Sequence, residues 1–320
     1  MCVSKKLFRV GINVKMILMF LFLFIGISYG KSEMVFDGKR AFELLKKQCM
    51  LGYRVPASAA SLRCADFIES ELHKIGIPVK RQNFRTYSKL LGATVPGINL
   101  IGDYRGDNST SDILALSAHW DTRPVAEKDP DPSMRDKPII GANDGASGVA
   151  LVLELARVLK ERRYPGRLLF LFFDLEDSGV SGSYEQWCLG SRFFAQHSLT
   201  EYPITAGINF DMIGDRDLKI QPSRLTAQFA QDMMREFWEL AEKQDPQHFS
   251  KMRLFFEIFD DHEPFLRKGI PYINLIDFNY PYWHTLEDTP DKCSPNSLQT
   301  VGNIAVEYVF LRLKKIKNNP

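Results

Sequence analysis

The stretch RLLFLFFDLED, residues 167–177, decides the fold class of this chain. After Arg167 comes an unbroken apolar run over 168–173. The stretch then ends with three carboxylates: Asp174, Glu176 and Asp177. A short unbroken apolar run is typical of a strand that is covered on both faces. We therefore predict a central strand over 167–173, with polar chemistry at its end.

The segments on either side alternate between strand-like and helix-like patterns. We expect strands over 77–85, 97–102, 112–118, 205–212 and 271–277, and helices over 38–50, 57–75, 146–161, from about 191, 224–243, 261–268 and 295–315. This alternation predicts an α/β fold in one domain, with a central, mostly parallel (mixed) sheet flanked by helices on both faces. Ligands of such sheets bind beyond the carboxyl ends of the strands.

The first thirty residues have a composition of their own. An apolar run over 16–27 follows four basic residues, Lys5, Lys6, Arg9 and Lys15. This order is typical of an export signal, and the run is shorter than the roughly 20 residues of a membrane-spanning helix. We expect a signal peptide over 1–30 and the catalytic domain over 31–320. The protein would then be periplasmic or secreted, or membrane-anchored if the segment is not cleaved.

The charge of the chain excludes some partners. Without residues 1–30, 37 basic and 39 acidic residues remain, which gives a net charge of about −2. No basic stripe is present, so nucleic acid is not an expected partner. Hydrophobic residues make up 45% and charged residues 25% of the chain, as in ordinary globular proteins. We expect a monomer.

Four cysteines lie outside the predicted signal: Cys49, Cys64, Cys188 and Cys293. Disulfides are permitted in an exported protein, and the pairs Cys49–Cys64 and Cys188–Cys293 are the ones we consider. Spacing does not determine the pairing. Four buried free thiols are the alternative.

Polar residues stand at the carboxyl ends of the predicted strands and in the loops beside them. They are His119, Asp121, Asp144, Asp174, Glu176, Asp177, Asp211, Asp215, Asp260, Asp261, His262 and His284. Each alone has an ordinary structural role open to it; Asp144, for example, precedes a helix that it could cap. Together at one sheet edge, so many carboxylates repel one another, and a divalent cation relieves that repulsion.

The residue types indicate zinc. Imidazole with carboxylate, and without thiolate, is typical of a catalytic zinc site that keeps one position open. Glu176 beside Asp177 suggests that one carboxylate binds the metal while its neighbour moves protons. The stretch GANDGASG, residues 141–148, fits neither phosphate-binding glycine motif, and an aspartate within it would repel phosphate. No Gly-x-Ser-x-Gly motif occurs, which disfavours a serine hydrolase.

Six stretches, in this order and spacing, resemble the zinc-aminopeptidase-like family that includes the glutaminyl-peptide cyclotransferases: SAHWDT, GANDGASG, FFDLED, NFDMIGD, DDHEPF and YWHTLEDT. The similarity extends from about residue 36 to 315. It implies one zinc with three ligands, Asp144, Asp177 and His284. It also implies that Glu176 is the proton shuttle and that Asp211 and Asp260 support it through hydrogen bonds.

Two tryptophans bear on the choice of reaction. Trp283 matches a tryptophan of the cyclotransferase substrate pocket, and Trp187 would form another aromatic wall. The sequence departs from the animal cyclotransferases in having aspartate rather than glutamate at 177, and in the length of the loop around Trp187. On the residues alone, Trp283 could equally fill core space under a loop.

The resemblance implies a reaction in which N-terminal glutamine of a peptide or protein becomes pyroglutamate with release of ammonia. Zinc would act as a Lewis acid, and a dry aromatic pocket suits a reaction that needs no water. The first alternative is a dinuclear zinc aminopeptidase, in which His119 and Asp211 hold a second zinc and Asp144 bridges. The second alternative is an exported binding protein with a degenerate site, which the intact Glu176 disfavours.

Overall fold

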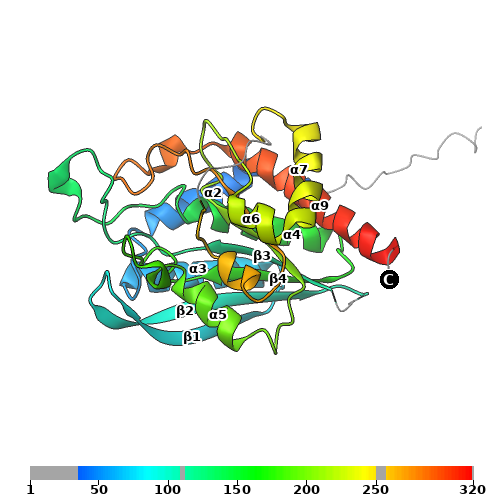
Figure 1. Cartoon of the computed structure of the whole chain (residues 1–320), viewed down its shortest axis with the longest axis horizontal. Helices are drawn as coiled ribbons and strands as arrows, with labels where there is room; N and C mark the ends of the chain where they lie inside the picture. The colour runs from blue at the N-terminus through cyan, green and yellow to red at the C-terminus, as the bar shows by residue number, and fades with distance from the viewer. Residues whose placement is uncertain (1–34, 109–111, 250–256, 319–320) are drawn as a thin grey trace, which may run out of the picture. The chain divides into compact units, whose positions relative to one another are not determined.

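A six-stranded sheet forms the centre of the molecule (Figure 1). The computed structural model describes residues 35–108, 112–249 and 257–318. In spatial order the strands are β1 (Val79–Ser88), β2 (Ala93–Arg105), β4 (Arg167–Phe173), β3 (Ile113–His119), β5 (Ala206–Asp211) and β6 (Tyr272–Ile276). The pairs β1–β2 and β2–β4 are antiparallel, and β4, β3, β5 and β6 run parallel. The predicted mixed, mostly parallel sheet is confirmed.

The described α-helices flank this sheet. They are α2 (Gly38–Met50), α3 (Ala59–Lys74), α4 (Ala146–Glu161), α5 (Leu189–His197), α6 (Arg224–Phe229), α7 (Gln231–Gln244), α8 (Glu263–Leu266) and α9 (Pro295–Asn318). Within the described part of the chain, three short 3-10 helices lie in the loops, at Pro132–Met134, Tyr184–Gln186 and Pro290–Lys292. Helix α4 packs on β3, β4 and β5, and α2 and α9 pack on α4.

Both faces of the sheet are covered by helices. Ala118 in β3 is the register partner of Phe172 in β4, so Ala118 and Phe173 point to opposite faces. On the Ala118 face, a side-chain carbon at Gly148 would lie 2.9 Å from the Cβ atom of Ala118, which is why α4 can approach so closely only with glycine there. On the other face, the ring of Phe173 lies 5.9 Å from that of Phe194 in α5.

The predicted helix over 224–243 is wrong in one respect, because it is two helices. Ser223 caps the first by accepting a hydrogen bond from the backbone N–H of Thr226. At Ala230 the backbone leaves the helical region, with φ −131° and ψ 39°. The break allows α6 to pack against β6 while α7 packs against α9 and β6. Tertiary packing overrides local propensity here, since alanine is itself a strong helix former.

Other boundaries differ more simply. The strands predicted over 77–85 and 97–102 are longer and form an antiparallel hairpin, and the helix predicted over 261–268 keeps only four residues. All four cysteines outside the predicted signal are buried free thiols, so neither disulfide that we considered is present. The signal peptide predicted over 1–30 lies outside the described residues. Within the described ranges, no helix is long and apolar enough to cross a bilayer.

Candidate metal centre and active site

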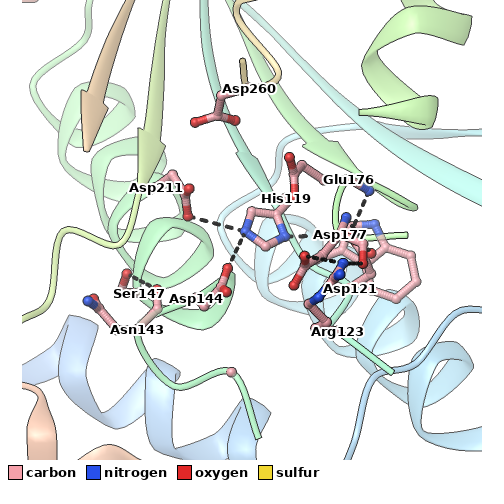
Figure 2. Close-up of polar contacts among 12 residues, drawn as sticks. His119, Asp121, Arg123, Asn143, Asp144, Ser147, Glu176, Asp177, Asp211 and Asp260 are labelled. Atoms are coloured by element: carbon pink, nitrogen blue, oxygen red, sulfur yellow. Dashed lines mark hydrogen bonds and ion pairs between the residues drawn. The ribbon is translucent and has the colours of Figure 1, made fainter. Parts of the chain in front are cut away.

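The predicted ligands converge at the carboxyl edge of the parallel strands. Figure 2 shows four of them: His119, Asp144, Asp177 and Asp211. His119 ends β3, and Asp211 ends β5. Asp177 follows β4, Asp144 lies directly before α4, and His284 follows β6. All five side chains are buried.

These residues form two triads that share Asp144. In the first triad, the Nε2 atom of His284 lies 3.2 Å from Oδ1 of Asp177 and 3.6 Å from Oδ2 of Asp144. In the second, Nε2 of His119 lies 3.2 Å from Oδ1 of both Asp144 and Asp211. Within each triad, one possible ligand atom of each residue lies within 4.8 Å of the others. Both sets offer imidazole nitrogen and carboxylate oxygen, which suit zinc.

The carboxylates of the first triad are not used for helix capping. The N-cap of α4 is Gly145, and no side chain caps that helix. The Oδ2 atoms of Asp144 and Asp177 are buried and have no hydrogen-bond partner among the described residues. Burying an ionised oxygen without a partner costs several kcal/mol, so a cation between these atoms would be strongly favoured. The residues therefore fit a metal ion.

Two further buried aspartates hold the loops that carry the ligands. Asp121 accepts hydrogen bonds from the backbone N–H groups of Glu176 and Asp177, at 3.1 and 3.2 Å. Asp288 accepts them in the same way from Asn143 and Asp144, at 2.8 and 3.1 Å. Each loop that carries a predicted ligand is thus held by a carboxylate that accepts hydrogen bonds from two successive backbone N–H groups.

Gly145 is required by the approach of these loops. Its φ is +97°, and an added side-chain carbon would lie 2.9 Å from the carbonyl oxygen of Asp121 and 3.2 Å from Cε1 of His119. The backbone must pass this close for Asp144 to reach the site. The glycine is therefore part of the ligand loop's geometry.

The charge of the site favours a cation. Burial opposes protonation of both histidines, yet the neighbouring carboxylates outweigh it. They raise the pKa of His119 well above its usual value, and that of His284 to about 9. Burial, together with the charge of Asp260, raises the pKa of Asp211 to about 7. Negatively charged groups outnumber positively charged ones at this site, and this imbalance favours the binding of a cation.

Glu176 lies outside both triads and is free for another task. Its carboxyl is buried, which together with nearby carboxylates raises its pKa well above the usual range, although His119 lowers it. Its Oε1 atom accepts a hydrogen bond from the thiol of Cys188, 3.3 Å away. Asp211 instead contacts His119, while Asp260 accepts hydrogen bonds from two amide side chains, Asn209 and Asn274. Among the described residues, neither aspartate has a hydrogen bond to Glu176, so the predicted hydrogen-bonded support is not seen. The charge of Asp260 does act on Glu176, where it adds to burial in raising the pKa.

Aromatic side chains enclose the site. A small cavity of about 50 Å³ touches the first triad, Glu176 and Asp211. It opens to an outer pocket of about 400 Å³. The two share five lining residues: Trp187, Ile258, Phe259, Phe278 and Trp283. The Trp187 ring lies parallel to that of His284, at 6.2 Å, and the Trp283 ring lies 4.1 Å from it. Both tryptophans are thus wall residues of the pocket, and Trp283 is not simply core filling.

Residues 99–309 match peptidase family M28. The chain belongs to this family.

The chain is similar to proteins that are named for two different activities, glutaminyl cyclase and aminopeptidase. The crystal structure of Bacteroides thetaiotaomicron glutaminyl cyclase has 31% sequence identity and a TM-score of 0.81, and the match covers 87% of this chain and 98% of that one. That of a leucine aminopeptidase precursor from the same organism has 31% identity and a TM-score of 0.82, with the same coverage. Aminopeptidase YwaD of Bacillus subtilis is 28% identical over 269 residues, which is 77% of this chain. The chain spans 53% of the length of that relative. The M28 family is zinc-dependent, and the two triads can hold metal.

Left-handed backbone conformation occurs at or beside several of the predicted site residues. Four residues other than glycine have positive φ there: Leu175, Cys188, Met212 and His284. Leu175 directly precedes Glu176. Cys188 and Met212 directly follow Trp187 and Asp211, and His284 is itself a predicted ligand. Such conformations cost about 1–3 kcal/mol each and persist where the surrounding structure imposes them. Their clustering supports the interpretation that this part of the molecule is a functional site.

Several residues that contact predicted site residues were not predicted from the sequence as part of the site, among them Cys188, Arg123 and Glu127. Cys188 directly follows Trp187, and its burial could have been expected, but not its bond to Glu176. Arg123 lies two residues beyond Asp121 in the same loop, which is the one available signal. Glu127 meets His284 across 157 residues of sequence, and nothing in the local pattern indicates that contact.

Proposed function

We propose that this M28 enzyme is a glutaminyl-peptide cyclotransferase, which converts N-terminal glutamine of peptides or proteins into pyroglutamate. The observation that carries the proposal is the aromatic enclosure of the first triad. Trp187 and Trp283 line both the small cavity and the outer pocket. A reaction that closes a ring within its own substrate needs no water, and an apolar wall excludes water that would otherwise hydrolyse the amide.

The residues present can perform this reaction. Glu176 removes a proton from the substrate's α-amine, whose nitrogen attacks the carbon of the γ-amide. The new N–C bond closes the ring, the former C–N bond breaks, and Glu176 returns the proton to the departing ammonia. A zinc ion held by Asp144, Asp177 and His284 would supply Lewis acidity to the γ-carbonyl oxygen. Asp211 and Asp260 would maintain the negative field that favours proton uptake by Glu176.

A dinuclear aminopeptidase is the second candidate, and the second triad favours it. His119, Asp144 and Asp211 form a complete donor set, and the leucine aminopeptidase precursor has the same fold. In that reaction Glu176 would activate water for attack on a peptide bond. Because both donor sets are complete, the preference for cyclisation rests on the walls of the pocket.

Two substrates separate these candidates. We expect the purified protein, loaded with zinc, to release ammonia from a peptide that begins with glutamine and to leave pyroglutamate at its N-terminus. We expect no release of leucine from a leucyl chromogenic substrate. Mass spectrometry of the peptide and a coupled ammonia assay measure the first result. Leucine release without cyclisation would refute the proposal in favour of the aminopeptidase.

The export signal expected over 1–30 is part of this proposal, and so are the peptides of the exported compartment as substrates. Mass spectrometry of the protein purified from its native host, with its N-terminus determined, tests the cleavage. An intact residue 1 would contradict it.

A further inference from the structure

A pair of side chains in the loop after β3 connects two predicted metal ligands. Arg123 is buried, and its Nε atom donates to both carboxylate oxygens of Glu127, at 2.9 and 2.7 Å. Glu127 is about one-third exposed, at 36% of its side chain. Neither residue belongs to a triad, and neither touches the small cavity that the proposed substrate would enter.

The glutamate of this pair fixes His284. Its Oε1 atom lies 2.7 Å from Nδ1 of the imidazole, and the backbone N–H of Lys128 donates to the His284 carbonyl at 3.1 Å. An ionised carboxylate can only accept, so the proton of the neutral ring resides on Nδ1. The lone pair on Nε2 then faces Asp144 and Asp177, as a metal ligand must.

The arginine of the pair fixes Asp177. Its Nη1 atom donates to the Asp177 carbonyl at 2.9 Å, to Oδ1 of Asp177 at 3.3 Å and to the carbonyl of Gly179 at 3.1 Å. The guanidinium also lies over the ring of Trp187, 4.7 Å from its centre. One buried cation therefore fixes a predicted ligand and seats part of the aromatic wall.

We propose that Arg123 and Glu127 act as one positioning unit, which orients His284 and Asp177 for metal binding and holds Trp187 against them. The unit rests on the metal site of the proposed function, and not on the choice between cyclisation and peptide hydrolysis. Groups that hold metal ligands from behind typically contribute 10- to 100-fold to metal affinity. The wall and the metal site are then coupled through a single guanidinium.

Zinc affinity without substrate tests the glutamate. We expect Glu127→Ala to weaken zinc binding about 10- to 100-fold in competition with a chromogenic chelator at pH 7.5. Glu127→Gln keeps an acceptor for the imidazole and should recover part of the loss. The matched control is Glu287→Ala, which removes an exposed glutamate close to His284 in sequence that pairs with Lys292. Zinc affinity of Glu127→Ala within twofold of the wild type would overturn the proposal.

A double-mutant cycle tests whether the two residues act as one. If they form a unit, Arg123→Gln with Glu127→Ala should lose little more zinc affinity than the worse of the two single variants. If the fold losses of zinc affinity in the two single variants multiply in the double variant, the two residues contribute independently. That result would overturn the proposal that they act as one unit. Circular dichroism of each variant with excess zinc checks the fold. Should Arg123→Gln fail to fold, Arg123→Lys takes its place, since it keeps the charge but loses the fork that binds Glu127 and Asp177 together.

Because zinc affinity is measured without substrate, the result is independent of the reaction. Unchanged zinc affinity in the variants, with pyroglutamate formed by the wild type, refutes the positioning unit alone. Weakened zinc affinity, with only leucine released by the wild type, refutes the cyclotransferase alone.

Discussion

Neighbouring carboxylates in the sequence DLED have different surroundings, and this difference assigns their roles. Oδ1 of Asp177 lies within 3.3 Å of both His284 and Arg123, so it is held in the metal site. Oε1 of Glu176 meets the thiol of Cys188, which is a weak hydrogen-bond donor. A weakly hydrogen-bonded, buried carboxylate beside the candidate metal site is well suited to move protons.

We expect Glu176→Gln to lower kcat about 100- to 10,000-fold, because it removes a general base without removing a ligand. Zinc content, measured by elemental analysis after gel filtration, should stay at the wild-type value. Asp177→Asn is the companion variant, and it should lose zinc together with activity. Turnover that survives in Glu176→Gln would show that another group carries the proton.

At this scale the sequence predicted which candidate ligands come together at the sheet edge, but not the residues that hold them in place. His119 and Asp211 each end a strand, and Asp177 follows a third, so sheet topology alone brings them together. Glu127 belongs to no periodic pattern, and its contact with His284 depends on how two loops that are far apart in the sequence meet. Such contacts become visible only in three dimensions.

Among the larger elements, the loop before α4 depends on a segment far away in the chain. Asp288 receives the amides of Asn143 and Asp144 and also the hydroxyl of Tyr280, at 2.8 Å. Its side chain is fully buried. The loop after β6 therefore carries one predicted ligand, His284, and also holds the loop that carries another, Asp144.

We expect Asp288→Ala to lower the free energy of unfolding by about 2–5 kcal/mol, because it leaves two buried N–H groups without an acceptor. Zinc affinity should fall as well, since Asp144 loses its support. Tyr280→Phe removes only the third hydrogen bond, so it should cost about 1 kcal/mol and leave zinc affinity unchanged. Urea unfolding measures the first effect and chelator competition the second. Equal effects of the two substitutions would contradict this account.

The elements themselves were largely predictable. The strand β4 and the helix α4 have the predicted bounds, because most of the residues in both are buried in the core. The long amphipathic pattern over 224–243 concealed the break at Ala230, since both halves bury an apolar face and the residue between them favours helix. A change in packing partner leaves no mark on local periodicity.

On the scale of the whole molecule, one buried carboxyl makes stability depend on pH. Asp277 follows β6 and is buried, and burial raises its pKa to about 7, although it accepts hydrogen bonds from the amides of Lys219 and Asn279. In the unfolded chain this group releases its proton near pH 4. Between these values the native state binds the extra proton, so this contribution to stability is full below about pH 4 and is lost as the pH rises to about 7.

We expect Asp277→Asn to remove that contribution. The difference in free energy of unfolding between wild type and variant should be a few kcal/mol more in favour of the wild type at pH 5 than at pH 8. Urea unfolding of both proteins at both pH values provides the measurement. A difference that is the same at pH 5 and pH 8 would mean that Asp277 titrates normally.

Metal binding should stabilise the whole molecule. The zinc-dependent rise in Tm of ligand variants should show whether one ion or two are bound. An ion that binds only the native state at 100 times its Kd adds about 2.7 kcal/mol, which corresponds to a rise in Tm of about 4–5 °C for a domain of this size. We expect zinc to produce this shift in the metal-free wild type, measured by circular dichroism. The shift should disappear in His284→Gln, which removes a ligand of the first triad.

His119→Gln separates one ion from two. His119 belongs only to the second triad, so with a single zinc in the first triad this variant should keep the full zinc-dependent rise in Tm. With two ions bridged by Asp144, each histidine supports one of them, and both variants should lose part of the rise. Elemental analysis of the wild type then gives one zinc per chain in the first case and two in the second. Since one zinc beneath an aromatic wall is the arrangement proposed for the cyclotransferase, a reduced shift in His119→Gln would favour the aminopeptidase.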